Sequence, residues 1–276
     1  METELHDWLR THPYLSRIAD VQARVEDAAA RAEAAPPPAP EQWEAYRAEY
    51  GRGIALLRAE QGRPDVAAQG AAALEQVIAA LDAAPLPDAV AAGVRELKDR
   101  LAGRPADLRG AVAWVLDGEH AQAPAQPGLL RYLGWSALRR VLAPTVAAFQ
   151  AWRDEDGWMH AHCPTCAARP VVAQLVPAAA GRERRLACGC CGTRWKFRRI
   201  GCPYCGNAAP EKIDVFEVEG EDGLRLDVCQ GCNGYLKTVA REGGPDLLLA
   251  DWTTLQLDAL ARERGYKRLG TSLYEL

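Results

Sequence analysis

The stretch that decides the fold runs from Leu186 to Gly206 and reads LACGCCGTRWKFRRIGCPYCG. It holds two C-x-x-C pairs, and one further pair lies on each side of it. All 9 cysteines of the 276-residue chain fall between Cys163 and Cys232. The paired cysteines are Cys163, Cys166, Cys188, Cys191, Cys202, Cys205, Cys229 and Cys232, and the remaining one is Cys190.

Four C-x-x-C pairs in so short a window predict metal binding, because two intervening residues let both thiolates reach one ion from a tight turn. Two pairs together complete a tetrahedral site of four sulfurs. The segments from Cys166 to Cys188 and from Cys205 to Cys229 are each long enough for one hairpin. The simplest assembly is therefore sequential, with two metal ions, and a cross-braced arrangement is the alternative. Iron and zinc both suit four thiolates.

The turns around these pairs make a further prediction about the backbone. The residue after the second cysteine is expected to have a positive φ, which glycine and asparagine tolerate best. Gly192, Gly206 and Asn233 occupy three of these positions, and Ala167 occupies the fourth. We therefore expect slight strain in the first turn.

Three other side chains near the pairs could serve as metal ligands. Cys190 offers a rival register in which it pairs with Cys188, but the x-x spacing of the other pairs favours Cys191. Cys190 is then interpreted as a structural or partly exposed thiol. His160 and His162 flank Cys163, and we interpret them as solvated loop residues, since four thiolates already complete the site.

Residues 1–157 contain no cysteine and read as Ala-rich amphipathic helices with short connections, which predicts an α-helical bundle domain. A run of prolines ends the first of these helices. The last helix is expected to be interrupted by Pro144. The expected helices cover residues 14–34, 41–61, 64–83, 87–101, 106–116 and 129–152.

After residues 154–157 the pattern changes to short β-like runs beside the cysteine turns, followed by one amphipathic helix at 253–264 that Gly265 caps. The expected strands are 171–176, 184–187, 195–200, 213–218 and 224–228. The predicted fold class is α with a small metal-binding β part. It comprises an all-helical domain (1–157), one rubredoxin-like or zinc-ribbon-like module (158–200), and a second module with the C-terminal helix (201–276).

Composition and motifs exclude several classes of protein. A net charge of -4 argues against a protein built to coat nucleic acid. The N-terminal METELHDWLR has no secretory character and no uncharged stretch is long enough to span a bilayer, so we expect a cytoplasmic protein with reduced thiols. There is no H-E-x-x-H, P-loop or G-x-S-x-G motif. Closed four-sulfur sites leave no position for a reactive water, so we expect a binding protein without catalytic residues.

Three stretches carry a family resemblance. The first is Cys163-Pro-Thr-Cys166 with Pro170 shortly after it, the second is the stretch 186–206, and the third is CQGCNGYLK at 229–237. Together they resemble the formate dehydrogenase accessory protein family, the FdhE type. The chain departs from the family pattern at Ala167, where glycine is usual, and at the extra Cys190.

The resemblance implies a cytoplasmic accessory protein that is required for formate dehydrogenase activity. It implies binding to the catalytic subunit during assembly and maturation, and a helical domain followed by two rubredoxin-like modules. Iron is implied as a plausible ion, and the eight paired cysteines match the family's ligand positions. Tyr235, Leu236 and Lys237 match the motif after the last cysteine pair, without an evident role.

A nucleic-acid-binding ribbon is one alternative interpretation. Basic residues around the second pair could contact phosphates, and Trp195 and Phe197 between them could stack on bases. The basic residues are Arg182, Arg184, Arg185, Arg194, Lys196, Arg198 and Arg199. Binding that is absent or insensitive to salt would exclude this reading.

A rubredoxin-like electron carrier or redox sensor is the other alternative. It requires iron in the four-thiolate sites, because zinc has no accessible redox couple. A colourless protein that contains zinc alone would exclude it.

Overall fold

The computed structural model describes residues 2–117, 124–179, 181–218, 220–221, 223–240, 247 and 249–274, without the side chains of residues 2 and 3. The chain forms two compact units. The helical unit consists of Ser16–Glu49 and Leu56–Arg153. The sheet unit consists of Met1–Leu15, Tyr50–Ala55 and Asp154–Tyr274. No helix in the described parts of the chain combines the length and apolar character needed to cross a bilayer.

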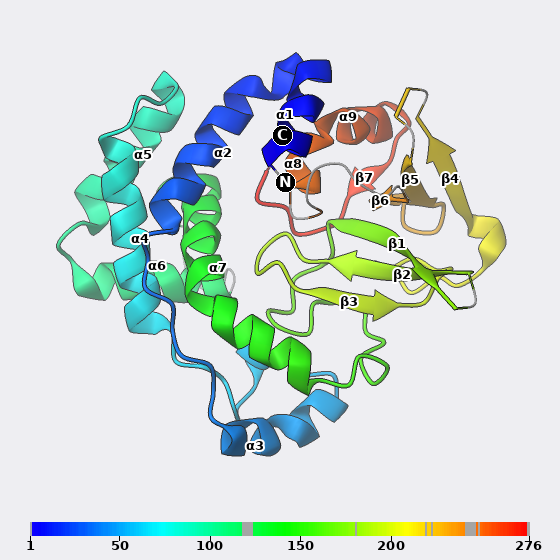
Figure 1. Cartoon of the computed structure of the whole chain (residues 1–276), viewed down its shortest axis with the longest axis horizontal. Helices are drawn as coiled ribbons and strands as arrows, with labels where there is room; N and C mark the ends of the chain where they lie inside the picture. The colour runs from blue at the N-terminus through cyan, green and yellow to red at the C-terminus, as the bar shows by residue number, and fades with distance from the viewer. Residues whose placement is uncertain are drawn as a thin grey trace. The chain divides into compact units, whose positions relative to one another are not determined.

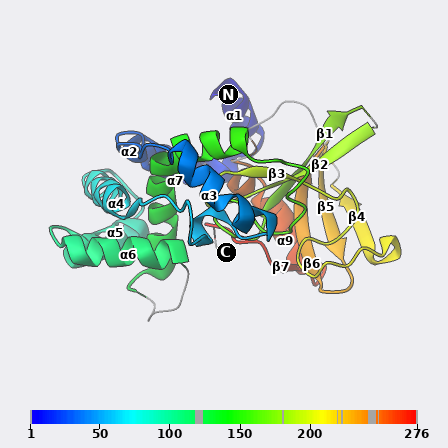
Figure 2. The ribbon, with the colours of Figure 1, turned by 90° about the horizontal axis from the view of Figure 1, so that it is seen from below.

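Helices of the helical unit pack around α4, which contacts α2, α5, α6 and α7 (Figures 1 and 2). The sequence permits this close approach because α4 is rich in alanine and carries Gly70, where an added Cβ would lie 3.0 Å from Leu138 and 3.1 Å from Val112. The elements are α2 (Ser16–Ala29), α3 (Pro40–Gly51), η2 (Leu56–Arg58), α4 (Ala67–Asp82), α5 (Asp88–Leu101), α6 (Pro105–Asp117) and α7 (Pro127–Trp152).

Two details of the helix prediction are wrong. α7 runs through Pro144 without interruption, because a buried face that includes Val141, Leu142 and Phe149 holds the helix across the hydrogen bond that proline removes. α3 ends at Gly51, well before the predicted end at residue 61. The chain turns there at Gly53, whose φ of 78° is open to glycine and costly for other residues.

The N-terminal residues lie in the sheet unit. Helix α1 (Glu2–Thr11) and the short helix η1 (Pro13–Leu15) precede the first helix that the sequence predicts. The Trp8 indole donates a hydrogen bond to the Thr253 carbonyl at 3.0 Å, and the His12 ring lies 2.7 Å from the Glu221 carboxylate. The domain boundaries at residues 157 and 200 stay predictions. The contacts of Trp8 and His12 show that the N-terminal segment packs within the sheet unit.

In the described residues, seven strands form one sheet in the order β3-β2-β1-β6-β5-β4, with β7 pairing to β6. Figure 1 shows β1, β2 and β3 side by side, as their antiparallel pairing requires. The strands are β1 (Val172–Ala178), β2 (Gly181–Ala187), β3 (Arg194–Phe197), β4 (Ile213–Glu217), β5 (Leu224–Cys229), β6 (Gly234–Val239) and β7 (Lys267–Arg268), with η3 (Pro210–Lys212) before β4.

The two predicted modules are joined through their inner strands. β1 pairs with β6 in parallel, with Val172 opposite Lys237 and Gln174 opposite Val239. The fold class of a helical region and a four-cysteine sheet region is confirmed, and strands β6 and β7 add to the five that the sequence predicts.

The C-terminal segment returns to the sheet after a broken helix. The predicted helix at 253–264 is split at Thr254 into α8 (Ala250–Thr253) and α9 (Leu255–Glu263). Gly265 caps α9 as predicted, with φ 82° and its amide bonded to the Arg262 carbonyl at 2.9 Å. Residues 267–274, which we call the C-terminal strap, follow α9. Lys267 and Arg268 pair with β6, and Thr271 bonds to Arg169.

Candidate metal centres

The first cluster gathers the thiols of Cys163, Cys166, Cys188 and Cys191. All four sulfurs lie within 4.8 Å of one another, and all four residues are buried. The Sγ–Sγ distances are 3.5 Å between Cys163 and Cys191 and 3.4 Å between Cys166 and Cys188. The turns before β1 and between β2 and β3 supply the two pairs.

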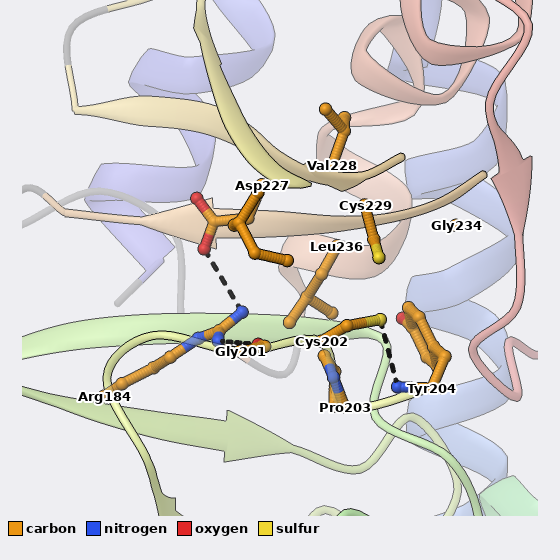
Figure 3. Close-up of a pocket in the computed structure, with 11 residues that line it drawn as sticks. Arg184, Gly201, Cys202, Pro203, Tyr204, Asp227, Val228, Cys229, Gly234 and Leu236 are labelled. Carbon is orange, nitrogen blue, oxygen red and sulfur yellow. Dashed lines mark hydrogen bonds and ion pairs between the residues drawn. The ribbon is translucent and has the colours of Figure 1, made fainter. Parts of the chain in front are cut away.

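The second cluster gathers the thiols of Cys202, Cys205, Cys229 and Cys232, again within 4.8 Å. Cys202 lies 3.6 Å from Cys232, and Cys205 lies 3.7 Å from Cys229, measured between the sulfurs. Figure 3 shows Cys202 and Cys229 reaching one small cavity from two different segments, next to Tyr204 and Leu236. Cys205 is exposed and Cys232 is half-buried.

Both clusters fit one tetrahedrally bound metal ion. Metal–sulfur bonds of about 2.3 Å at tetrahedral angles place the sulfurs about 3.8 Å apart, close to the Sγ–Sγ distances of 3.4–3.7 Å within the clusters. The grouping is the sequential one. Cys190 is buried but belongs to neither cluster, and His160 and His162 also lie outside both. The donor set is therefore four sulfurs in each case, which suits zinc or iron and leaves no open position.

The backbone of all four turns agrees with the sequence prediction. The residues after the second cysteines have positive φ, namely 67° at Ala167, 78° at Gly192, 76° at Gly206 and 55° at Asn233. Amides inside three of the turns point at a sulfur. The Cys190 and Tyr204 amides each lie 3.4 Å from the thiols of Cys188 and Cys202, and the Gly231 amide bonds to Cys229. Such amides stabilise the negative charge of thiolates.

Ala167 is the strained member of the four turns and allows a stability test. Ala167→Gly is expected to raise the free energy of unfolding of the metal-loaded chain by about 1 kcal/mol, because a left-handed conformation costs alanine about 1–2 kcal/mol and the freer unfolded glycine chain offsets part of the gain. Urea unfolding measures the change. The neighbouring Ala168→Gly should instead destabilise by about 0.5–1 kcal/mol. Equal decreases in the free energy of unfolding of both variants would contradict backbone strain at Ala167.

Burial opposes ionisation of the clustered thiols. It raises the pKa of the Cys163 thiol well above its ordinary value. At Cys229 burial also acts to raise the pKa, but hydrogen bonds from the Cys232 and Gly231 amides and from the Asn207 side chain outweigh it and lower the pKa to about 7. Four thiolates cannot crowd together without a cation to neutralise them. A bound cation in each cluster would offset the cost of ionising these buried thiols.

His160 is exposed, as predicted for a solvated loop residue, whereas His162 is partly buried. The Trp195 indole donates to the His160 carbonyl, and the Trp158 indole donates to the His162 carbonyl, both at 3.0 Å. The His162 ring contacts the Gly53 carbonyl at 3.0 Å, and burial lowers the pKa of His162. The bond from Trp195 attaches the segment before Cys163 to β3.

Two residues of the motif Tyr235, Leu236 and Lys237 belong to a buried ionic network on β6. The Lys237 ammonium lies 2.9 Å from the Asp258 carboxylate and 2.6 Å from the Asp251 carbonyl, and only 2% of the Lys237 side chain is exposed. The Tyr235 hydroxyl donates to Asp258 at 2.6 Å. The network holds α8 and α9 against the strand that follows the last cysteine pair.

The same network fixes the C-terminal strap. Arg268 forms an ion pair with Asp251, and the Ser272 hydroxyl donates to the Asp251 carboxylate at 2.7 Å. The sequence analysis did not predict the network. Its signal in the sequence is a lysine inside an apolar strand, followed by Asp251 in α8 and Asp258 in α9.

The basic stretch at 182–199 is partly buried and paired, although Arg182, Arg198 and Arg199 are exposed. Trp195 and Phe197 are buried and cannot stack on bases. Arg184 is buried against Asp227 at 3.2 Å and donates to the Gly201 carbonyl, as the dashed lines in Figure 3 show. Arg185 pairs with Glu155 and Glu183, and Lys196 pairs with Asp156 and Glu183. Pairing within the sheet unit therefore accounts for Arg184, Arg185 and Lys196, and burial of the two aromatic rings removes the base stacking that the nucleic-acid interpretation requires.

The fold and the clusters define a class of proteins with a helical unit and a sheet unit that gathers two sets of four thiols. Residues 200–274 match the family model described as FdhE, C-terminal domain. An FdhE homolog from Stutzerimonas stutzeri is 31% identical over 202 residues, which cover 70% of this chain and 63% of the relative. One from Aquifex aeolicus is 30% identical over 118 residues, 41% of each chain.

The solved structures give the same result for the fold. The crystal structure of the FdhE protein from Pseudomonas aeruginosa matches with a TM-score of 0.62 at 22% identity, covering 95% of this chain and 88% of that one. The alignments with the two curated relatives span less than two thirds of the relatives' length. Sequence and fold together confirm the resemblance to the FdhE family.

Proposed function

We propose that this chain is an FdhE-type accessory protein that binds the catalytic subunit of a formate dehydrogenase during assembly. The observation that carries the proposal is the pair of four-thiol clusters in an FdhE-like fold. In this proposal Cys163, Cys166, Cys188 and Cys191 hold one ion, and Cys202, Cys205, Cys229 and Cys232 hold the other. Each ion is iron or zinc, and a reducing cytoplasm keeps the thiols available.

The geometry supports binding rather than catalysis. A tetrahedral site that is filled by four sulfurs supplies no bound water for hydrolysis, so its contribution is to fix the chain around it. Each ion would connect two turns that lie far apart in sequence. The turns and the chain around them would then be rigid before a partner arrives, which lowers the entropic cost of binding.

The proposal predicts loss of formate dehydrogenase activity when the gene for this chain is deleted, and recovery when the chain is restored. A tagged chain should co-purify with the dehydrogenase catalytic subunit. Cys163→Ser and Cys202→Ser should abolish both recovery and co-purification, because each removes a ligand. Glu44→Gln, which removes only an exposed ion pair with Arg47, is the matched control and should behave like the unchanged chain. Normal dehydrogenase activity in the deletion strain would refute the proposal.

A further inference from the structure

The two clusters have the same donors but differ in their exposure to solvent. In the first cluster all four cysteines are buried. In the second, Cys205 is exposed and Cys232 is half-buried, while Cys202 and Cys229 are buried. Equal spacing in the sequence therefore produces two unequal sites.

The C-terminal strap and two threonines close the first cluster. Thr271 bonds to the Arg169 backbone through both its amide and its hydroxyl, at 3.2 and 3.1 Å. A Cβ placed on Gly189, between two ligands of this cluster, would lie 3.0 Å from the Thr271 carbonyl oxygen. The hydroxyls of Thr165 and Thr193 lie 2.7 Å apart in the buried turns of the same cluster. An incoming ligand has no direct approach to these sulfurs.

Two exposed glycines border the second cluster. A Cβ on Gly206 would meet no atom within 4 Å. A Cβ on Gly231 would lie 3.5 Å from the Cys229 sulfur, 3.6 Å from the Asn207 amide nitrogen and 3.9 Å from the Cys205 sulfur. Because Gly231 has no side chain, the sulfurs of Cys229 and Cys205 stay uncovered on this side. A larger residue at position 231 would shield them.

We propose that the second cluster is a metal-exchange site that opens at Cys205, whereas the first cluster retains its ion. The ligands that fit are small thiols and aromatic nitrogen chelators, because the ion in a four-thiolate site is soft or borderline. When an incoming thiol binds, its sulfur replaces that of Cys205 on the ion, and the Cys205 thiolate takes up the proton that the thiol releases. No oxidant or reductant is needed. The inference rests on the metal binding in the proposed function.

The test begins with chain loaded to two zinc ions, checked by elemental analysis. An excess of 4-(2-pyridylazo)resorcinol then reports zinc release by colour. We expect one equivalent in a fast phase and one in a slow phase, with rates at least about tenfold apart, because the first cluster must open locally before release. Brief iodoacetamide treatment followed by peptide mass mapping should modify Cys205 during the fast phase and spare Cys163 and Cys166.

Gly231→Ala is the diagnostic variant. Its φ is not in the positive range and the added methyl makes ordinary contacts, so the fold should tolerate it. It should slow the fast phase severalfold and leave the slow phase unchanged. Gly110→Ala, in α6 with no atom within 4 Å of the added Cβ, is the control and should change neither phase.

The outcomes separate this inference from the proposed function. Release of both ions in a single phase, or first labelling at Cys163, would overturn the exchange site while metal binding stands. A chain that cannot be loaded with two ions would contradict the metal sites of the proposed function itself.

Discussion

Cys163→Ser is expected to unfold the sheet unit and to leave the helical unit folded. Cys163 is fully buried with its sulfur 3.5 Å from that of Cys191, so serine removes a ligand where nothing can replace it. A structural site of this type contributes on the order of 10 kcal/mol to folding, which is comparable to the whole stability of a domain, about 5–15 kcal/mol. The parallel pairing of β1 with β6 should carry the loss from the first cluster into the second.

Near-ultraviolet circular dichroism and metal analysis measure this effect, while far-ultraviolet circular dichroism follows the surviving helices. Cys190→Ser is the matched control, since it makes the same chemical change beside the cluster at a thiol that is not one of the four. It should retain two ions and a folded sheet. Native circular dichroism and full metal content in Cys163→Ser would contradict the ligand assignment, and metal loss in Cys190→Ser would favour the rival register.

Lys237→Met is expected to lower the free energy of unfolding by about 3–5 kcal/mol, because removing one partner of a buried ion pair leaves an uncompensated charge. Lys237 and Arg268 balance Asp251 and Asp258 inside the network. Methionine fills the space of the lysine stem but leaves one negative charge in excess. The strap and α9 should detach first, since the network holds both against β6.

Urea unfolding of metal-loaded chains measures the loss. Lys196→Met is the control. This lysine lies on another strand, and its solvent-screened ion pairs with Asp156 and Glu183 should contribute little to stability. The double variant Lys237→Met with Asp258→Asn should recover part of the loss, because it restores charge balance. Equal effects of the two lysine substitutions would contradict a structural role for the motif.

The cysteine spacing favoured the sequential grouping of the thiols that the structure has, and the turn residues predicted the positive φ at Ala167 and Asn233. These features are local, since each depends on a few adjacent residues. Strand β6 was not predicted, because Lys237 interrupts its apolar pattern. The lysine can be buried because Asp251 and Asp258 compensate its charge. The position of β6 between β1 and β5 is seen only in the structure.

Long-range contacts limited the rest of the prediction. The bond from Trp8 to the Thr253 carbonyl joins residues 245 positions apart, which no local pattern reveals. Arg184 reads as part of a solvated basic face until Asp227 is placed opposite it. The unequal exposure of the two clusters was also not predictable from local sequence, because the residue that covers the first cluster, Thr271, lies near the C-terminal end of the chain.

The metal content of the chain after anaerobic purification tests the central claim most directly. About two equivalents of iron and zinc combined are expected per chain, one for each cluster of four thiols. A metal-free chain that keeps its folded sheet, with every cysteine open to titration as a free thiol, would contradict it.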